Sequence, residues 1–298
     1  MAITEKVVAI IGCGSMGTAI AGGILDALAD TNNVKSPIMI SRLIATVGTD
    51  AAKKRVVETL SRHAEKLDIR LRSDNLEVFR QADIIVLSVK PVKWRGIIEE
   101  PGMREALGGK LLISIIAGVK TEVLHQAING SDKATRPQMC QIVRTMPNMG
   151  AQIRRSMTLG TTIPGTVSEQ NMETTRWILE QVGKFQLTDE VHFDMSGVLV
   201  GCAGSLIMLA VDGLLDAAVS EGLKRSEAQP LVVESAIGML SLLTRENGGH
   251  PSLMRELIAS PGGSSIRALL ELEKQGVRSA YTEAIIQAAE RSKEMSKL

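Results

Sequence analysis

The chain changes its pattern near residue 190, and this change limits the folds that it can adopt. Before this point, apolar runs of strand length alternate with stretches of helical periodicity. The runs lie at 7–11, 37–40, 68–71, 83–89, 110–118, 141–146, 157–161 and 184–188. Fully apolar strands that are separated by helices are typical of a parallel sheet covered on both faces.

Beyond residue 190 the periodicity is helical throughout. Helical patterns occupy 192–222, 226–246, 250–258, 264–274 and 278–296. We therefore predict an α/β domain over residues 1–190 and an all-helical domain over 191–298, which a length of 298 residues accommodates. The uncharged run 195–211 is slightly short for a membrane span and predicts a buried helix.

A glycine motif, GCGSMG at 12–17, joins the first predicted strand to a helix. Gly12 permits a tight turn, Gly14 allows a pyrophosphate to approach the backbone, and Gly17 allows close packing of helix and strand. The helix N-terminus adds a positive field. The motif predicts a Rossmann-type dinucleotide-binding domain, with cofactor contacts at Gly12, Gly14, Ser15, Met16 and Gly17.

The end of the second strand decides which dinucleotide such a domain prefers. NAD-specific domains place an acidic residue there, against the ribose hydroxyls. Here the predicted strand 37–40 is followed by Ser41 and Arg42. A hydroxyl and a guanidinium suit a ribose 2′-phosphate, so we predict that NADPH is preferred and that NADH binds more weakly.

Two further strand ends are expected to border the crevice that binds the dinucleotide. Val89, Lys90 and Pro91 follow one strand, and Asn148 follows another. In open α/β sheets the ligand lies beyond the carboxyl ends of the strands. These residues are therefore expected to border the nicotinamide half of the cofactor.

Charge and cysteine content exclude several classes of function. The formal net charge is +1 and no long run has one sign, so we predict neither a nucleic-acid nor a membrane partner. Cys13, Cys140 and Cys202 are far apart and lack the spacing of a disulfide framework or a zinc site, so no metal is predicted. Reduced thiols are expected, and with them a cytoplasmic location.

The sequence SPGGSS at 260–265 opens one of the C-terminal helices and has two interpretations. In the first, the glycines turn the chain and Ser264 caps the helix. In the second, consecutive small residues leave backbone N–H groups bare at a helix N-terminus, which can bind a carboxylate or a phosphate. This segment alone does not decide between a cap and an anion site.

Several of these motifs resemble those of the pyrroline-5-carboxylate reductase family. The similarity runs nearly end to end and includes GCGSMGTAIAGGIL, VKP at 89–91, MPN at 146–148, DAAVSEGLKRSEA at 216–228 and the segment 250–278. The resemblance implies an NADPH-dependent enzyme that reduces a cyclic imine carboxylate, 1-pyrroline-5-carboxylate, to proline. It also implies a homodimer built from the C-terminal helices, which can assemble further.

The resemblance assigns the SPGGSS segment to the substrate. In the family the matching loop holds the substrate carboxylate on backbone N–H groups, which implies contacts at Gly262, Gly263 and Ser264. The hydroxyl that matches Ser265 lies near the ring nitrogen, which makes Ser265 the candidate catalytic residue. Orientation and a dry pocket then supply most of the catalysis, since a cyclic imine is basic enough to take a proton from solvent.

The chain also departs from the family pattern, which keeps alternatives open. VGCAGSL at 200–206 replaces the usual serines, proline and aromatic residue, Met149-Gly150 replaces Thr-Pro, and 43–67 looks like an inserted or extended surface helix. A substituted or larger cyclic imine is therefore an alternative substrate, and a non-catalytic NADP-binding sensor is an alternative function. A β-hydroxyacid dehydrogenase is disfavoured, because the stretch 198–211 contains no lysine.

Overall fold

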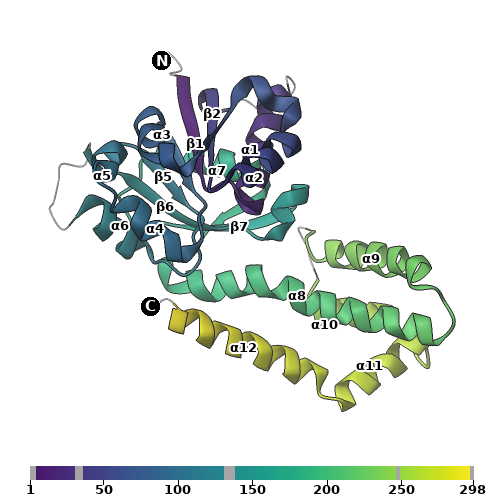
Figure 1. Cartoon of the computed structure of the whole chain (residues 1–298). Helices are drawn as coiled ribbons and strands as arrows, with labels where there is room; N and C mark the ends of the chain where they lie inside the picture. Colours follow the sequence, from purple (N-terminus) through teal and green to yellow (C-terminus); the bar gives the residue numbers. More distant parts are fainter. Residues whose placement is uncertain (1–4, 31–35, 131–137, 246–248, 296–298) are drawn as a thin grey trace. The chain divides into compact units, whose positions relative to one another are not determined.

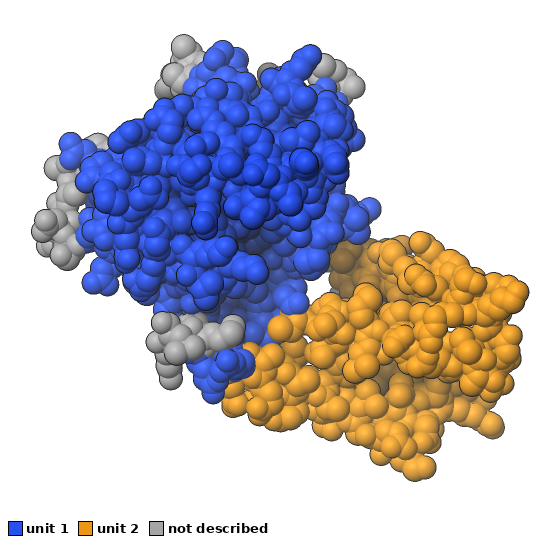
Figure 2. All heavy atoms as spheres, viewed as in Figure 1, with its two compact units in different colours: residues 1–201, 291–298 blue, residues 202–290 orange. Residues whose placement is uncertain are grey.

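A computed structural model describes residues 5–30, 36–130, 138–245 and 249–295. The chain forms two compact units, residues 1–201 with 291–298 and residues 202–290 (Figure 2). The long helix α8, Glu190–Ser220, belongs to both. The predicted domain boundary at residue 190 coincides with the first residue of this helix, whereas the two units divide inside it.

The first unit is built on one sheet of eight strands in the order β3-β2-β1-β4-β5-β6-β7-β8. The strands are β1 Glu5–Ile11, β2 Met39–Val47, β3 Leu67–Leu71, β4 Ile84–Leu87, β5 Leu111–Ser114, β6 Gln141–Met146, β7 Ser156–Thr161 and β8 Gly183–Leu187. All pairs from β3 to β6 are parallel. The sequence thus predicted the existence of every strand of this sheet.

Helices cover both faces of the sheet (Figure 1). They are α1 Ser15–Ala29, α2 Asp50–Thr59, α3 Asn75–Gln81, α4 Trp94–Ile98, α5 Met103–Leu107, α6 Thr121–Asn129 and α7 Glu169–Glu180, with 3₁₀ turns η1 Ser61–Lys66, η2 Arg72–Asp74, η3 Pro91–Lys93 and η5 Met149–Ile153. Successive residues of β1 point to opposite faces. Val8 packs in the core that contains Ile20 of α1, and Ala9 packs in the core that contains Phe79 of α3. The predicted α/β architecture with two covered faces is confirmed.

Two expectations about the sheet are wrong. The second strand does not end at Ile40, because β2 continues to Val47 and pairs with β1 as far as Thr46 opposite Ile11. The sheet is also not fully parallel, because β7 runs antiparallel to β6. The connection 147–155 between these two strands is too short for the crossover that parallel neighbours need.

The segment 43–67 is an integral part of the first unit, because it completes one strand and leads into the next. Its first residues complete β2, and α2 and η1 then lead into β3. Thr49 caps α2 by accepting a hydrogen bond from the backbone N–H of Ala52. Val56 is the residue of α2 that is fully buried, so this helix does lie on the surface, as predicted.

The second unit contains helices alone among its described residues. These are the rest of α8, then α9 Arg225–Leu242, α10 Pro251–Ile258, α11 Ser264–Lys274 and most of α12 Val277–Met295, whose last residues belong to the first unit. The predicted helices 226–246 and 278–296 each end on a residue outside the described part of the chain. Together with the first unit, these helices confirm the predicted order of an α/β region followed by a helical region.

The second unit leaves most of its apolar side chains exposed in a single chain. Among its described residues, the buried hydrophobic side chains are Leu215, Ala228 and Ala289. The exposed ones on α8 include Met208 and Leu209. By length and composition α8 could cross a membrane, and it is the one helix among the described residues that could. The expectation that 195–211 forms a buried helix is wrong for the single chain.

Candidate active site

The glycine loop between β1 and α1 is shaped by its contact with the end of β4. Gly12 has a φ of +87°, and a Cβ atom there would lie 2.5 Å from Cγ1 of Val89. A Cβ at Gly17 would lie 2.6 Å from Oγ of Ser88. That same hydroxyl donates a hydrogen bond to the carbonyl of Gly12 at 2.7 Å. Glycine is therefore required at both positions by packing alone.

Gly14 differs, because no atom lies within 4 Å of the position that its Cβ would take. It is the N-cap of α1 and makes no side-chain hydrogen bond, and the first turn contains no acidic residue. Ser15 is exposed in that turn, whereas Met16 is half-buried and packs against the core. The N-terminus of α1 thus offers bare N–H groups and a positive field beside open space, which fits a pyrophosphate.

A cavity of about 810 Å³ lies beyond the carboxyl ends of the strands β1, β2, β3 and β4. Its walls include Gly12, Gly14, Gly48, Asn75 and Val89. Asn75 is buried, and its Oδ1 atom has no hydrogen-bond partner in the described structure. A buried, unpaired acceptor is costly and calls for a donor from a ligand, such as a ribose hydroxyl. The glycine cradle, the volume and this orphaned acceptor fit a dinucleotide.

The assignment of Ser41 and Arg42 to the cofactor is wrong. Both lie near the start of β2, and Arg42 pairs with Val7 in the ladder, so they are at the opposite edge of the sheet from the glycine loop. The Ser41 hydroxyl donates to the carbonyl of Lys6, and the Arg42 guanidinium donates to the side chain of Gln81 at 2.9 Å. The error follows from the position at which the second strand was thought to end.

Two other arginines line the cavity where β2 and β3 do end. Arg55 projects from α2, and Arg72 opens η2 directly after β3. Both side chains are exposed, and neither forms an ion pair with a carboxylate among the residues that the structure describes. Sequence reasoning missed them because it placed the strand end too early. The signal was the apolar run 43–47, which continues the strand.

The residues expected on the nicotinamide side are only partly brought together. Val89 and Lys90 line the cavity, and Pro91 begins η3 immediately after them. Asn148 does not line the cavity: its Oδ1 accepts from the N–H of Gly150 at 3.1 Å, and its Nδ2 donates to the carbonyl of Val200. Asn148 therefore shapes the turn after β6, and its contact with a cofactor stays a prediction.

The predicted substrate loop precedes α11, in the second unit. Gly262 has a φ of +71°, and the N–H of Gly263 donates to the carbonyl of Ser260 at 3.1 Å. The N-cap of α11 is Gly263, which provides no side-chain cap, and Ser264 is already the first helical residue. The cap interpretation of Ser264 is therefore wrong, and the first-turn N–H groups have no side-chain cap.

Ser264 and Ser265 have different surroundings. Ser264 is exposed, whereas Ser265 is half-buried and lines an apolar cavity of about 400 Å³. The other walls of this cavity come from α9, α10 and α11 and include Leu240, Met254 and Leu269. A hydroxyl beside apolar walls is suited to directing a single polar contact in an otherwise dry environment.

Comparison with known proteins gives one consistent relationship. A protein from Lophium arboricola named pyrroline-5-carboxylate reductase is 33% identical over 297 residues, which cover 96% of this chain and 92% of the relative. This chain belongs to the pyrroline-5-carboxylate reductase family. A second relative, a delta-1-pyrroline-5-carboxylate reductase of Curvularia clavata, is 32% identical and is covered to 88% of its length.

The models of two protein families match separate parts of this reductase. Residues 7–118 match "NADP oxidoreductase coenzyme F420-dependent", and residues 190–295 match "Pyrroline-5-carboxylate reductase dimerisation". The first match covers the glycine loop and the large cavity. The second begins at the first residue of α8 and covers the helices with exposed apolar faces. The helical unit is thus a dimerisation region, and the reductase is an oxidoreductase.

Solved structures agree with this fold. Pyrroline carboxylate reductase of Plasmodium falciparum with NADP bound is 25% identical, with a TM-score of 0.78 and 98% of each chain covered. The Coxiella burnetii pyrroline-5-carboxylate reductase has a TM-score of 0.80 at 24% identity, covering 99% of this chain and all of that one.

Proposed function

We propose that this reductase converts 1-pyrroline-5-carboxylate to proline with NADPH. The observation that carries the proposal is the open Gly14 cradle at the uncapped start of α1, beside a cavity whose Asn75 acceptor lacks a partner. Family membership supports the imine substrate. The bound cofactor supplies a hydride for the carbon of the C=N bond.

The chain's own residues bind and orient the reactants. The N–H groups at the start of α1 hold the pyrophosphate, and those around Gly262, Gly263 and Ser264 hold the substrate carboxylate. The Ser265 hydroxyl lies near the imine nitrogen and favours its protonated form, which makes the carbon a better hydride acceptor. Cys13, in the glycine loop, takes no part in the reaction, because burial raises the pKa of its thiol to about 11 and keeps it protonated.

The experiment compares 1-pyrroline-5-carboxylate with 1-pyrroline, which lacks the carboxylate. We expect the first to be reduced much faster by the parent protein, and Gly263→Val to abolish that difference, because a side chain there would collide with Ser260. Equal activity on both imines, before and after the substitution, would contradict an anion site. Absence of NADPH oxidation with any cyclic imine would favour the alternative function, a non-catalytic NADP-binding sensor.

A substituted or six-membered imine is a second candidate substrate. The changes at Gly204 and Leu206, where the family usually has a proline and an aromatic residue, favour it. Ratios of kcat/KM across a series of ring sizes decide between the two substrates. A steep preference for the unsubstituted five-membered ring would exclude the second.

For the cofactor, we propose that Arg55 and Arg72 recognise the 2′-phosphate of NADPH. They line the cavity at the ends of β2 and β3, where a ribose 2′ group is bound in domains of this type. Losing one charged contact costs about 1.5–3 kcal/mol, which corresponds to roughly ten- to a hundredfold in affinity. Arg72→Ala should therefore raise KM for NADPH and leave KM for NADH unchanged. An Arg42→Ala control should alter neither, and equal effects on both cofactors from Arg72→Ala would contradict the assignment.

The assembly and location complete the proposal. The exposed faces of α8 to α12 are covered by the same helices of a second chain, which gives a homodimer that can assemble further. The formal net charge of +1 and the free cysteines support a cytoplasmic enzyme.

A further inference from the structure

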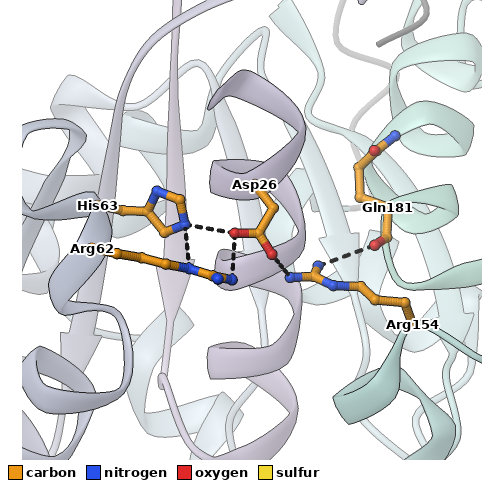
Figure 3. Close-up of polar contacts among 5 residues, drawn as sticks. All are labelled: Asp26, Arg62, His63, Arg154 and Gln181. Atoms are coloured by element: carbon orange, nitrogen blue, oxygen red, sulfur yellow. Dashed lines mark hydrogen bonds and ion pairs between the residues drawn. The ribbon is translucent and has the colours of Figure 1, made fainter. Parts of the chain in front are cut away.

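A cluster of charged residues lies on the side of α1, away from the glycine loop. Asp26, near the end of this helix, accepts hydrogen bonds from Arg62 and His63 of η1, each at 2.6 Å, and from Arg154 (Figure 3). The Arg154 guanidinium also donates to the carbonyl of Gln181 at 3.1 Å. The Asp26 carboxylate thus connects α1 with η1. Arg154, in the segment after β6, connects this pair with the segment after α7.

Arg154 is held in an unusual backbone conformation at the end of η5. Its φ of +61° makes it the one non-glycine residue with a positive φ among the described residues. Its N–H donates to the carbonyl of Ala151, and the N–H of Arg155 donates to that of Gly150. Arg154 therefore ends a short, hydrogen-bonded segment, 148–153, and its guanidinium connects this segment to α1.

The helix makes room for this arginine at Gly23. A Cβ at Gly23 would lie 2.5 Å from Nη1 of Arg154, whereas one at Gly22 would lie at an ordinary contact distance, 3.7 Å, from Nη2. Gly23 is also closely approached by the carbonyl of Gln181. Gly23, which the dinucleotide motif does not require, thus has a role in admitting the guanidinium.

The segment that Arg154 holds lies at the end of the sheet where the cofactor reacts. The cavity extends from the ends of β2 and β3 to the end of β4. A dinucleotide whose adenosine lies at the ends of β2 and β3 therefore points its nicotinamide toward β5 and β6. Asn148 lies two residues after the end of β6, and its side chain forms the first turn of the segment. Displacing 148–153 would therefore change the surroundings of the carboxyl end of β6, toward which the nicotinamide points.

We propose that Arg154, through its ion pair with Asp26, is a positioning residue that fixes segment 148–153 relative to the cofactor-binding helix. The proposal rests on the proposed function for the identity of the cofactor. Affinity comes chiefly from the pyrophosphate and adenosine contacts, which Arg154 does not touch. Its loss should therefore change the orientation of the nicotinamide more than the binding of NADPH.

The test uses Arg154→Asn, because asparagine suits the left-handed backbone while removing the guanidinium. We expect the Kd for NADPH to change less than about threefold and kcat to fall about ten- to a hundredfold, since small displacements of reacting groups have effects of that size. Arg154→Lys, which keeps a charge toward Asp26, should recover part of kcat. The lifetime of reduced-nicotinamide fluorescence in the NADPH complex should shorten in Arg154→Asn.

The matched control is Arg62→Ala, which removes another cation from the same carboxylate but does not touch η5. It should leave kcat and the fluorescence lifetime as in the parent protein. Equal losses of kcat and Tm in both variants would reduce the cluster to a structural role and overturn the proposal. The fluorescence measurement needs no imine, so a changed lifetime would support it even if 1-pyrroline-5-carboxylate were not the substrate.

Discussion

At the scale of single residues, Gly14 and Gly17 are three positions apart in one motif and have different physical roles. Gly17 is closed in by Ser88, whereas Gly14 faces open space. Gly17→Ala should therefore destabilise the fold by about 1–3 kcal/mol through overpacking. Gly14→Ala should fold normally and bind NADPH more weakly, because the added methyl group occupies the path of the pyrophosphate. Thermal unfolding and NADPH titration of both variants separate the two effects, and parallel behaviour would contradict them.

His125 of α6 should make stability depend on pH. Its Nδ1 accepts from Asn129, and its Nε2 is buried without a partner, so burial lowers its pKa below the ordinary value of 6.5. The unfolded chain then binds the proton more readily, and the free energy of unfolding falls as the pH drops through 6.5. Urea unfolding at pH 7 and pH 5 should show a smaller difference for His125→Gln than for the parent. Identical differences would exclude this histidine as the cause.

At the scale of elements, the start of α8 is held on β6 by a pair of buried ionic contacts. Arg144 of β6, with 3% of its side chain exposed, pairs with Glu190 at 2.6 Å and with Asp194 at 2.8 Å. Its guanidinium also lies 4.1 Å from the centre of the Phe193 ring. Removing one partner of a buried ion pair costs about 3–5 kcal/mol, and the partly solvated carboxylates favour the lower value.

We therefore expect Arg144→Met to lower the free energy of unfolding by about 3 kcal/mol. Arg291→Met serves as the control, since the pair Arg291–Glu294 is exposed on α12 and should change stability by less than about 1 kcal/mol. Denaturant unfolding of both variants at one protein concentration gives the comparison. Similar losses from the two substitutions would show that α8 is not held by this pair.

Strand positions were predictable at this scale because the central parallel strands, such as β4 Ile84–Leu87, are continuous apolar runs. In β2 the apolar pattern is interrupted by an exposed Ser41 and a half-exposed Arg42, while the hydrogen-bond ladder continues. That interruption moved the expected 2′-phosphate site to the wrong edge of the sheet. The glycine motif was placed correctly because its geometry is local. The Asp26 cluster was missed because its members are joined only by the tertiary fold.

At the scale of the whole molecule, the helical unit cannot bury its apolar surface alone. Met208 and Leu209 of α8 are 61% and 69% exposed in the single chain. A charge on such a surface would be buried without a partner in a dimer, so Leu209→Glu should shift the protein toward monomers. Leu209→Met should leave it dimeric. Light scattering after gel filtration measures the mass, and a dimer that survives Leu209→Glu would show that this part of α8 lies outside the interface.

The exposed helices also determine that folding of the first unit can precede association of the second unit with another chain. The first unit has a hydrophobic core on both faces of its sheet, made from its own side chains. The second unit can complete its packing only by collision with another chain, so recovery of the native assembly after dilution from denaturant is a second-order process. Its half-time should lengthen as the chain concentration falls. The apolar helices then stay uncovered for longer, and the choice between correct pairing and aggregation is made during that interval.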